Sequence, residues 1–194
     1  MRLVLASRNA HKLRELNLLL APHELIALPD SVELPPETGA TFAENALVKA
    51  RTAAAATGMP AVADDSGIEA AALGGAPGIY SARFAGEGAS DGANLAKLLR
   101  DVPPDGDTRV AYVCALVLVE PGGHEIVAEQ RCRGRLTHEP RGDGGFGYDP
   151  AVAPDDYDGG RTMAELSAAE KDAISHRGRA ARELLVLIDR EAAR

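Results

Sequence analysis

The sequence is short of aromatic residues and of cysteine. It has no Trp, and Phe, Trp and Tyr together make up 4% of its 194 residues. Because Ala, Gly and Arg are abundant in the same chain, we attribute this scarcity to genomic composition and infer no function from it. The two cysteines, Cys114 and Cys132, match no metal-binding spacing. We expect buried thiols of a reducing compartment, with a disulfide as the alternative.

Positive charge is also scarce. The chain has 21 Lys and Arg residues against 29 Asp and Glu residues, so its formal net charge is −8 and its pI is near 5.1. A protein that holds duplex DNA or RNA needs a basic face to neutralise phosphates. The charge balance therefore disfavours a nucleic acid polymer as a partner. A small anionic substrate remains compatible with it, if a few cations and a metal ion converge locally.

Long hydrophobic runs are absent. No apolar stretch approaches the roughly 18 residues that a transmembrane helix requires, and the apolar run at residues 3–6 is too short for a signal peptide. We therefore expect no membrane partner and a soluble, cytoplasmic protein. With 45% hydrophobic and 26% charged residues, the composition predicts one globular domain over residues 1–194, with two lobes and no separable linker.

The chain does contain an apolar run that ends in two carboxylates. Residues 60–63 predict a buried strand, and Gly67 allows the bend that ends it, with a continuation as a strand through residues 68–73 as the alternative. A strand that brings carboxylates to the edge of a sheet suits Mg²⁺. Because neighbouring side chains of an extended chain point to opposite faces, we expect one of Asp64 and Asp65 in a site and the other in the turn. A plain Asp-Ser-Gly turn is the alternative.

A second candidate site follows the strand predicted at residues 3–6. Residues 13–20 carry a leucine face typical of a helix, and Ser7 or Asn9 can cap its start. Backbone N–H groups, the positive end of the helix dipole and Lys12 would then meet in one place, which favours phosphate binding. The glycine-rich Walker pattern is absent, which excludes a standard P-loop. An ordinary strand-to-helix connection is the alternative.

The remaining pattern predicts an α/β protein with a mixed sheet. Thr41 and Glu44 fit a capping box that opens a helix ending at Gly58. This gives Glu44 a structural role that competes with a catalytic one. Residues 109–120 are the longest strand signal, and a Pro-Gly-Gly turn leads into a second strand through residues 126–127. A long antiparallel pair beside parallel strand-helix units makes the sheet mixed.

Two segments late in the chain carry further candidate groups. Residues 143–150 form a loop whose glycines allow close approach of the backbone to a ligand, while Phe146 offers a flat surface for a base. A turn anchored by a buried aromatic residue is the alternative. After two capping boxes, Lys171, His176 and Arg177 place three hydrogen-bond donors within a few residues. Solvated helix charges are the alternative there.

Taken together, these segments resemble the inosine triphosphate pyrophosphatase family. The resemblance runs in the family's order over nearly the whole chain, through SxNxxKxxE at 7–15, TFxENA at 41–46, ADDSG at 63–67, GGAPGxYSxR at 74–83, GFGYDP at 145–150 and SHRG at 175–178. It implies an elongated mixed β-sheet with flanking helices, two lobes around a central nucleotide-binding cleft, and a homodimer. It also implies Mg²⁺-dependent hydrolysis of the deaminated purine nucleotides ITP, dITP and XTP to the monophosphate and pyrophosphate, which removes them from the nucleotide pool.

The resemblance further assigns roles to residues of this chain. Asp65 would bind Mg²⁺ and activate water, with Glu37 as a second metal ligand and Asp64 as a supporting carboxylate. The triphosphate would be held by the first loop, with Lys12 as the main cation: Ser7, Arg8, Asn9, Ala10, His11 and Lys12. The rest of the nucleotide would be held by Ser66, Phe146, Gly147, Tyr148, Asp149, Lys171, His176 and Arg177.

Selectivity for deaminated purines would follow from hydrogen bonding. Hypoxanthine and xanthine present a 6-oxo acceptor where adenine presents a 6-amino donor, and His176, Arg177 or backbone donors aimed at that atom would mispair with adenine. A buried mispaired polar group costs roughly 1–3 kcal/mol. Two other functions compete. A non-catalytic nucleotide sensor would not need both Asp65 and Lys12. A haloacid-dehalogenase-type phosphatase would need an Asp-x-Asp pair after its first strand.

Overall fold

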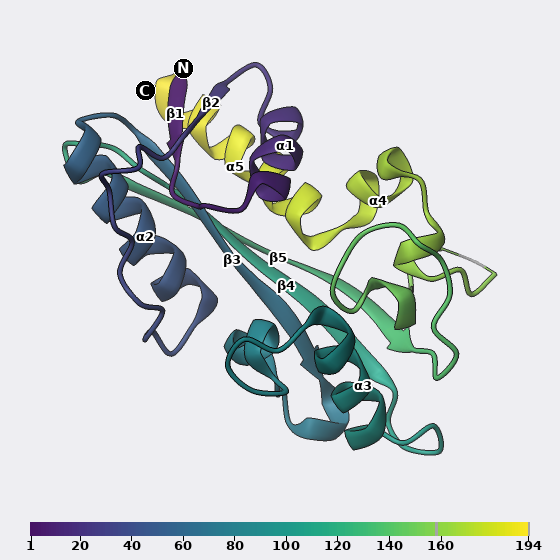
Figure 1. Ribbon diagram of the computed structural model, residues 1–194. Coiled ribbons are helices and arrows are strands. Elements are labelled where there is room, and N and C mark those ends of the chain that lie inside the picture. The colour runs from purple at the N-terminus through teal and green to yellow at the C-terminus, as the bar shows by residue number, and fades with distance from the viewer. Residues whose placement is uncertain (158, 194) are drawn as a thin grey trace. The chain divides into compact units, whose positions relative to one another are not determined.

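The computed structural model describes residues 1–157 and 159–193, and within them six strands form one sheet in the order β2-β1-β3-β4-β5-β6 (Figure 1). The strands are β1 (Arg2–Leu5), β2 (Glu24–Ala27), β3 (Ala61–Ala70), β4 (Arg109–Val119), β5 (Glu125–Leu136) and β6 (Val152–Pro154). β1 pairs in parallel with both β2 and β3, whereas β5 and β6 are antiparallel. The predicted mixed sheet of an α/β protein is confirmed.

Among the residues that the structure describes, five α-helices accompany the sheet, and the second of them begins and ends at the predicted capping residues. They are α1 (Ala10–Leu19), α2 (Phe42–Thr57), α3 (Asp91–Asp101), α4 (Ala168–Ile174) and α5 (His176–Ala192). Thr41 caps α2, since its Oγ1 accepts a hydrogen bond from the backbone N–H of Glu44 at 3.1 Å. The Glu44 carboxylate accepts from the N–H of Ala40 at 2.7 Å, one residue before the cap. Gly58 ends α2 in the left-handed conformation, with φ of 66°.

The chain divides into two units. The first unit holds Met1–Asp65, Cys114–Gln130 and the segment from Arg177 onward, and the second holds Ser66–Val113 and Arg131–His176. The chain passes between the units within β3, β4 and β5 and at the start of α5. The expectation of a single domain over residues 1–194 stays a prediction.

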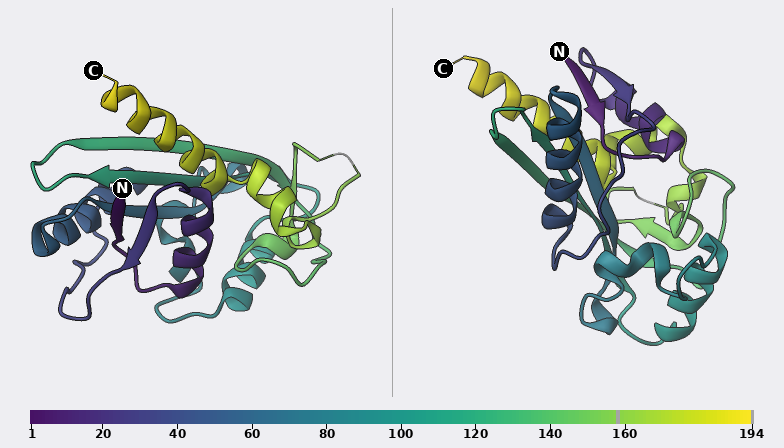
Figure 2. Two further views of the ribbon diagram at one scale, coloured as in Figure 1. Left: turned by 90° about the horizontal axis from the view of Figure 1, so that it is seen from above. Right: turned by 60° about the vertical axis from the view of Figure 1, so that its left-hand side comes forward.

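In the first unit, β1 separates two apolar clusters. Leu3 and Leu5 face a cluster that includes residues of α1 and α5, whereas Val4 faces the alanine-rich side of α2. This alternation is the period of two expected of a strand buried on both faces. Figure 1 shows α1 beside α5 and α2 apart from both. Figure 2 shows α5 lying across the β4–β5 hairpin, where the first cluster continues.

The core of the second unit is a third apolar cluster. It joins β3, β4 and β5 to α3 through Ile68, Val110 and Leu98 and includes the buried ring of Tyr112. Gly67 does not end β3 as predicted, because the strand continues to Ala70. Ile68 and Ala70 are fully buried, so the pattern of alternate buried residues extends past the glycine.

The structure also decides the state of the two cysteines and adds a strand that the sequence did not predict. Cys114 and Cys132 are buried free thiols, which confirms the prediction and excludes the disulfide alternative. β2 was not predicted, because residues 22–39 are polar and rich in proline. This short strand pairs only with β1 at the edge of the sheet, and Leu25 is its one buried residue.

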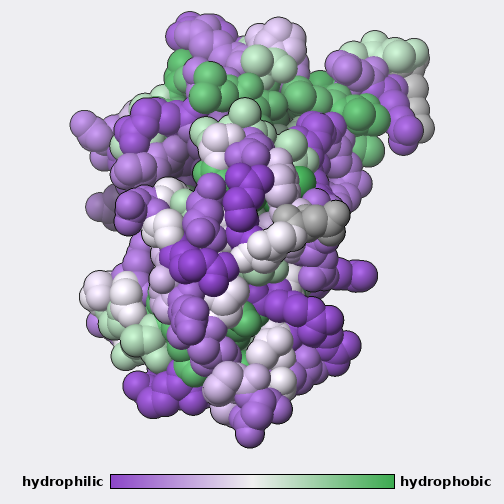
Figure 3. Space-filling model, turned by 90° about the vertical axis from the view of Figure 1, so that its right-hand side faces the viewer, coloured by the Kyte–Doolittle hydropathy of each residue, from purple (hydrophilic) through white to green (hydrophobic). Residues whose placement is uncertain are grey.

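Hydrophobic residues lie mainly in the three clusters. None of the helices in the described part of the chain is long and apolar enough to cross a membrane. Figure 3 shows one face on which hydrophilic residues dominate and hydrophobic residues gather in a smaller band near the upper edge.

The left-handed glycine that ends α2 gives the first prediction. We expect Gly58→Ala to lower the free energy of unfolding by about 1–2 kcal/mol, because a Cβ disfavours positive φ even though no atom lies within 4 Å of its position. Gly122→Ala is the matched control, since Gly122 has equal space and no positive φ. There we expect a change within about 0.5 kcal/mol. Equal losses in urea unfolding of the two variants would contradict this account.

Candidate active site

Asp64 is the buried centre of an ion-pair cluster in the first unit. Its Oδ1 lies 2.9 Å from Lys12 Nζ, and its Oδ2 accepts hydrogen bonds from Arg177 Nη2 at 3.0 Å and Nε at 3.2 Å. The Asp64 side chain is fully buried and that of Arg177 is 2% exposed. Arg177 Nη1 also donates to Glu15 at 3.0 Å. The cluster therefore ties β3 to both α1 and α5.

The charges of this cluster keep Asp64 ionised. Burial alone would raise the pKa of its carboxyl, but Lys12, Arg177 and Lys49 together outweigh burial and lower the pKa well below its usual range. Burial likewise opposes the charged form of Arg177, and the carboxylate of Asp64 raises its pKa instead. A lone buried charge would be costly, so each partner depends on the others.

Asp65 points to the opposite face of β3, toward α2. Its Oδ2 accepts a hydrogen bond from Asn45 Nδ2 at 3.0 Å, and Asn45 Oδ1 accepts from the backbone N–H of Gly39 at 2.8 Å. A Cβ on Gly39 would lie 2.8 Å from Asn45 Oδ1, so only glycine allows this approach. The two aspartates lie on opposite faces of the strand, as predicted. The prediction that one of them lies in a turn is wrong, because β3 continues past both of them to Ala70.

Glu37 and Lys49 lie near Asp65. Lys49 Nζ donates to Glu37 Oε1 at 2.6 Å and to the backbone carbonyl of Asp64 at 2.9 Å. The pKa of Asp65 is raised, chiefly by burial; the charge of Lys49 opposes this shift and that of Glu37 adds to it. The structure thus places two carboxylates and a buried ammonium within electrostatic reach of one another.

This donor set fits a magnesium ion. Mg²⁺ is usually bound through one or two carboxylates and completes its shell with water and substrate phosphates. Glu37 and Asp65 provide two carboxylates, and a cation would relieve the repulsion that helps raise the pKa of Asp65. Among the described residues, no group of three or more His, Cys, Asp or Glu could hold a metal ion, which disfavours an all-protein cage.

The first loop is organised by its own side chains. Ser7 Oγ accepts from the N–H of Asn9 at 3.1 Å, and Asn9 Oδ1 accepts from those of His11 and Lys12 at 2.8 and 3.3 Å. Asn9 is therefore the helix cap. Ala10, the first residue of α1, is exposed.

Arg8 does not fit the expected phosphate contact through its side chain. Its guanidinium donates to the carbonyl oxygens of Leu28, Pro29 and Val32 at 2.7 to 3.1 Å, and to Asp30. These bonds hold the segment after β2. They leave Arg8 as an anchor of that segment, because both terminal nitrogens of its guanidinium donate to it.

Asp149 has a comparable central position in the second unit. Its Oδ1 accepts from the Tyr112 hydroxyl at 2.9 Å, and its Oδ2 accepts from the backbone N–H of Phe146 at 2.9 Å and from Lys171 Nζ at 2.6 Å. A Cβ on Gly145 would lie 2.0 Å from this Oδ2. The loop therefore needs glycine at this position to close over the carboxylate.

The aromatic loop presents one ring outward and holds the other inside. Phe146 is 47% exposed, and Lys171 Nζ lies 5.2 Å from the centre of its ring. Tyr148 is buried, and its hydroxyl donates to the carbonyl of Ser81 at 2.7 Å. Gly147 N–H donates to Asp91 at 2.9 Å. Phe146 is thus the ring that a base can stack on, and Tyr148 anchors the loop.

His176 and Ser66 complete the predicted set in the second unit. The imidazole of His176 stacks on the ring of Tyr112, with centroids 4.9 Å apart and planes inclined by 11°. Ser66 is half-buried in β3. The structure thus brings Phe146, Asp149 and Lys171 together, with Tyr112 linking them to His176.

Three residues around these groups were missed by the sequence prediction. Asn45 and Lys49 lie one turn apart on the buried side of α2, and a polar pair on an otherwise apolar helix face was an available signal. Tyr112 lies in an apolar strand, where its ring is typical of the core. Nothing in the sequence distinguished its hydroxyl from that of any other buried tyrosine.

The buried ion pair gives a stability prediction. We expect Arg177→Met to lower the free energy of unfolding by about 3–5 kcal/mol, because Asp64 loses its main buried partner. Adding Asp64→Asn should recover part of that loss. Arg51→Met is the matched control, since it removes an exposed pair with Glu125 and should cost at most about 1 kcal/mol. A double variant less stable than Arg177→Met in urea unfolding would contradict this assignment.

Comparisons with known proteins match this geometry to one family. A relative from Frankia alni, named dITP/XTP pyrophosphatase, is 54% identical over 200 residues that cover 97% of each chain. One of the same name from Mycolicibacterium paratuberculosis is 52% identical and covers 96% of this chain and 95% of its own. The solved structure of a HAM1 protein from Coxiella burnetii has a TM-score of 0.89 and 41% identity, and covers 98% of this chain and 99% of its own. The model of the Ham1 family matches residues 3–187, and the chain therefore belongs to the Ham1 family.

Proposed function

We propose that this chain is a Mg²⁺-dependent nucleoside triphosphate pyrophosphohydrolase that converts ITP, dITP and XTP to the monophosphate and pyrophosphate. The observation that carries the proposal is the Asp65 carboxylate, 7% exposed and with a raised pKa, beside Glu37 and Lys49. The relatives from Frankia alni and Mycolicibacterium paratuberculosis are named dITP/XTP pyrophosphatase, which supports the same substrate class.

Glu37 and Asp65 are the residues that would hold the metal. Bound there, Mg²⁺ would neutralise phosphate charge and polarise the phosphoryl oxygens. The chain holds the two metal-binding carboxylates in place, because Asn45 donates a hydrogen bond to Asp65 and Lys49 donates one to Glu37. Both contacts come from α2, so a single rigid helix sets the separation of the two carboxylates.

Asp65 would also accept the proton of the attacking water. A general base works best when its pKa lies near the working pH, and burial with the neighbouring charge of Glu37 raises that of Asp65 in this direction. The water would attack the α-phosphorus and release pyrophosphate. Asp64 is unsuited to the base role because its neighbouring cations lower the pKa of its carboxyl, which makes the carboxylate a weak base.

Cations of the first unit would bind the triphosphate. Lys12 lies in the first turn of α1, where the positive end of the helix dipole adds to its charge. Lys12 forms an ion pair with Asp64, and an ammonium has three donors. Lys12 can therefore keep that pair and still donate to a phosphate. Electrostatic stabilisation of the leaving pyrophosphate is the main contribution a protein makes to phosphoryl transfer.

The second unit would bind the base. Phe146 offers an exposed ring face for stacking, with Lys171 fixed beside it by Asp149. Donors at Lys171 and His176 would pair with the 6-oxo group of hypoxanthine or xanthine. Adenine, with a 6-amino donor at the same place, would leave a mispaired buried group.

The same proposal includes a cellular setting. It comprises removal of deaminated nucleotides from the pool, a homodimeric state and a cytoplasmic location. Support for these three points is the membership of the Ham1 family.

Product analysis tests the reaction. Incubation of the full chain with ITP and Mg²⁺ should yield inosine monophosphate and pyrophosphate, and a chelator in excess should stop turnover. Inosine diphosphate with orthophosphate would contradict the proposed point of attack. Tight binding of ITP without any product would favour a nucleotide sensor.

The base role of Asp65 gives a sharper prediction. Asp65→Asn should reduce kcat by at least about a hundredfold, because loss of general base catalysis alone costs roughly that much, while the thermal midpoint stays close to that of the parent chain. Asp105→Asn, at an exposed loop position, is the control and should keep full activity. Parental kcat in the Asp65→Asn chain would remove Asp65 from the base role.

Tyr112 gives a prediction about positioning on the base side. Tyr112→Phe keeps the ring stacked on His176 but removes the hydroxyl bond to Asp149. One lost hydrogen bond of about 1 kcal/mol predicts a rise of about fivefold in KM for ITP. kcat should change little, because the reacting phosphate is bound elsewhere. The exposed Tyr80→Phe variant is the control, and equal KM values for the two variants would exclude this role.

A further inference from the structure

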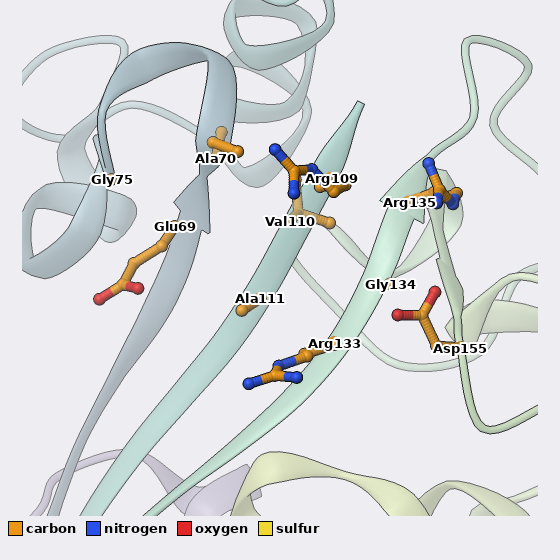
Figure 4. A pocket seen from close by; sticks show the side chains of 11 residues that line it. Glu69, Ala70, Gly75, Arg109, Val110, Ala111, Arg133, Gly134, Arg135 and Asp155 are labelled. Atoms are coloured by element: carbon orange, nitrogen blue, oxygen red, sulfur yellow. The ribbon is translucent and has the colours of Figure 1, made fainter. Parts of the chain in front are cut away.

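The second unit carries an arginine-lined pocket that belongs to no part of the candidate active site. The pocket has a volume of about 450 Å³, within the range of pockets that hold small ligands. Figure 4 shows the side chains of Arg109, Arg133 and Arg135 standing on β4 and β5 around Ala111. Because Ala111 is small, the floor of the pocket stays open between the longer arginine side chains.

The pairing of β4 and β5 brings these arginines together. The backbone N–H of Leu136 donates to the carbonyl of Thr108 at 2.8 Å, and this register sets Arg109 opposite Arg135. Like charges in directly opposite positions of a sheet repel each other. Arg133 lies two residues before Arg135, on the same face of β5, and adds a third positive charge.

The nearby carboxylates do not neutralise the group. Asp107 pairs with Arg109, Nη2 to Oδ2 at 2.5 Å, and Glu69 pairs with Arg131 beside the pocket. For Arg133 and Arg135 the described residues provide no ion pair, although Asp155 lies at the pocket wall. Arg135 also lies within electrostatic reach of Asp107. Counting Asp155, the guanidinium groups of Arg133 and Arg135 still leave one positive charge in excess at the pocket, in a chain whose net charge is −8.

We propose that this pocket is a second anion site, which binds a small molecule through a phosphoryl group. A phosphoryl dianion offers the oxygen pairs that guanidinium groups bind in bidentate fashion. Its charge would offset the repulsion between the opposed Arg109 and Arg135. The pocket has room beyond one phosphoryl group, so the same chemistry admits inorganic pyrophosphate or a phosphate ester.

Titration of the full-length chain with pyrophosphate, without Mg²⁺ and at low ionic strength, tests the site. The readout is the amide NMR shift of Ala111, Arg133 and Gly134, which separates this pocket from binding at the first loop. We expect saturable shifts there. Inorganic phosphate and inosine monophosphate are the other two probes. Tighter binding of pyrophosphate would identify the inorganic diphosphate as the ligand, and tighter binding of the monophosphate would identify an ester.

Three double variants locate the binding. Arg133→Gln with Arg135→Gln should weaken pyrophosphate binding at these amides by at least about tenfold, through loss of charge-assisted hydrogen bonds. Arg133→Lys with Arg135→Lys should retain part of it, since charge remains without the bidentate fork. Arg100→Gln with Arg190→Gln removes the same charge from exposed positions outside the pocket and should bind as the parent does.

Three results would overturn the proposal. The first is an absence of saturable shifts, or equal affinity in the glutamine variant. The second is an equal response to acetate at the same ionic strength, which would indicate screening alone. The third is a change in sedimenting mass of the glutamine variant, which would make this face a contact between copies of the chain. ITP hydrolysis by the variant should equal that of the parent, and binding is measured without it, so the two proposals fail separately.

Discussion

The interaction on which the first unit depends is the buried pairing of Asp64 with Lys12 and Arg177. Because the carboxylate is fully buried, its charge is tolerable only while both cations remain in place. The pairing fixes α1 and α5 to the middle strand of the sheet. It also fixes the backbone of Asp65, whose side chain must then emerge on the opposite face, toward α2. Two neighbouring carboxylates thus have separate environments.

Each of the two units contains a buried aspartate that organises the side chains around it, with a different result in each unit. In each, a buried aspartate accepts several hydrogen bonds and thereby orders side chains from distant parts of the chain. Asp64 collects cations near the first loop, whereas Asp149 joins a tyrosine, a lysine and the loop that exposes Phe146. Glycine is required where the backbone meets such a group, as at Gly39 and Gly145. Order in both regions therefore comes from hydrogen bonding to carboxylates more than from apolar packing.

Local sequence patterns correctly predicted the structural features that depend only on neighbouring residues. Capping at Asn9, Thr41 and Ser167 depends on residues within one turn, and the structure has these caps where the sequence predicts them. The alternation of β1 and the length of β4 follow in the same way from neighbouring residues. Gly67 misled the prediction because a glycine permits a bend but does not impose one. The burial of Ile68, which only the tertiary core decides, keeps the strand extended.

The sequence by itself determined the element types, the candidate residues and, through six ordered motifs, the family. Only the tertiary structure decided which partner each charged group has. It directed Arg8 to the segment after β2 and Arg177 to Asp64, and it gave Lys49 and Tyr112, which belong to none of the six motifs, contacts with the backbone of Asp64 and with Asp149. The physical reason is that an ion pair or a buried hydrogen bond depends on distance and desolvation in space. Residues 113 positions apart, such as Asp64 and Arg177, carry no local sign that they will meet.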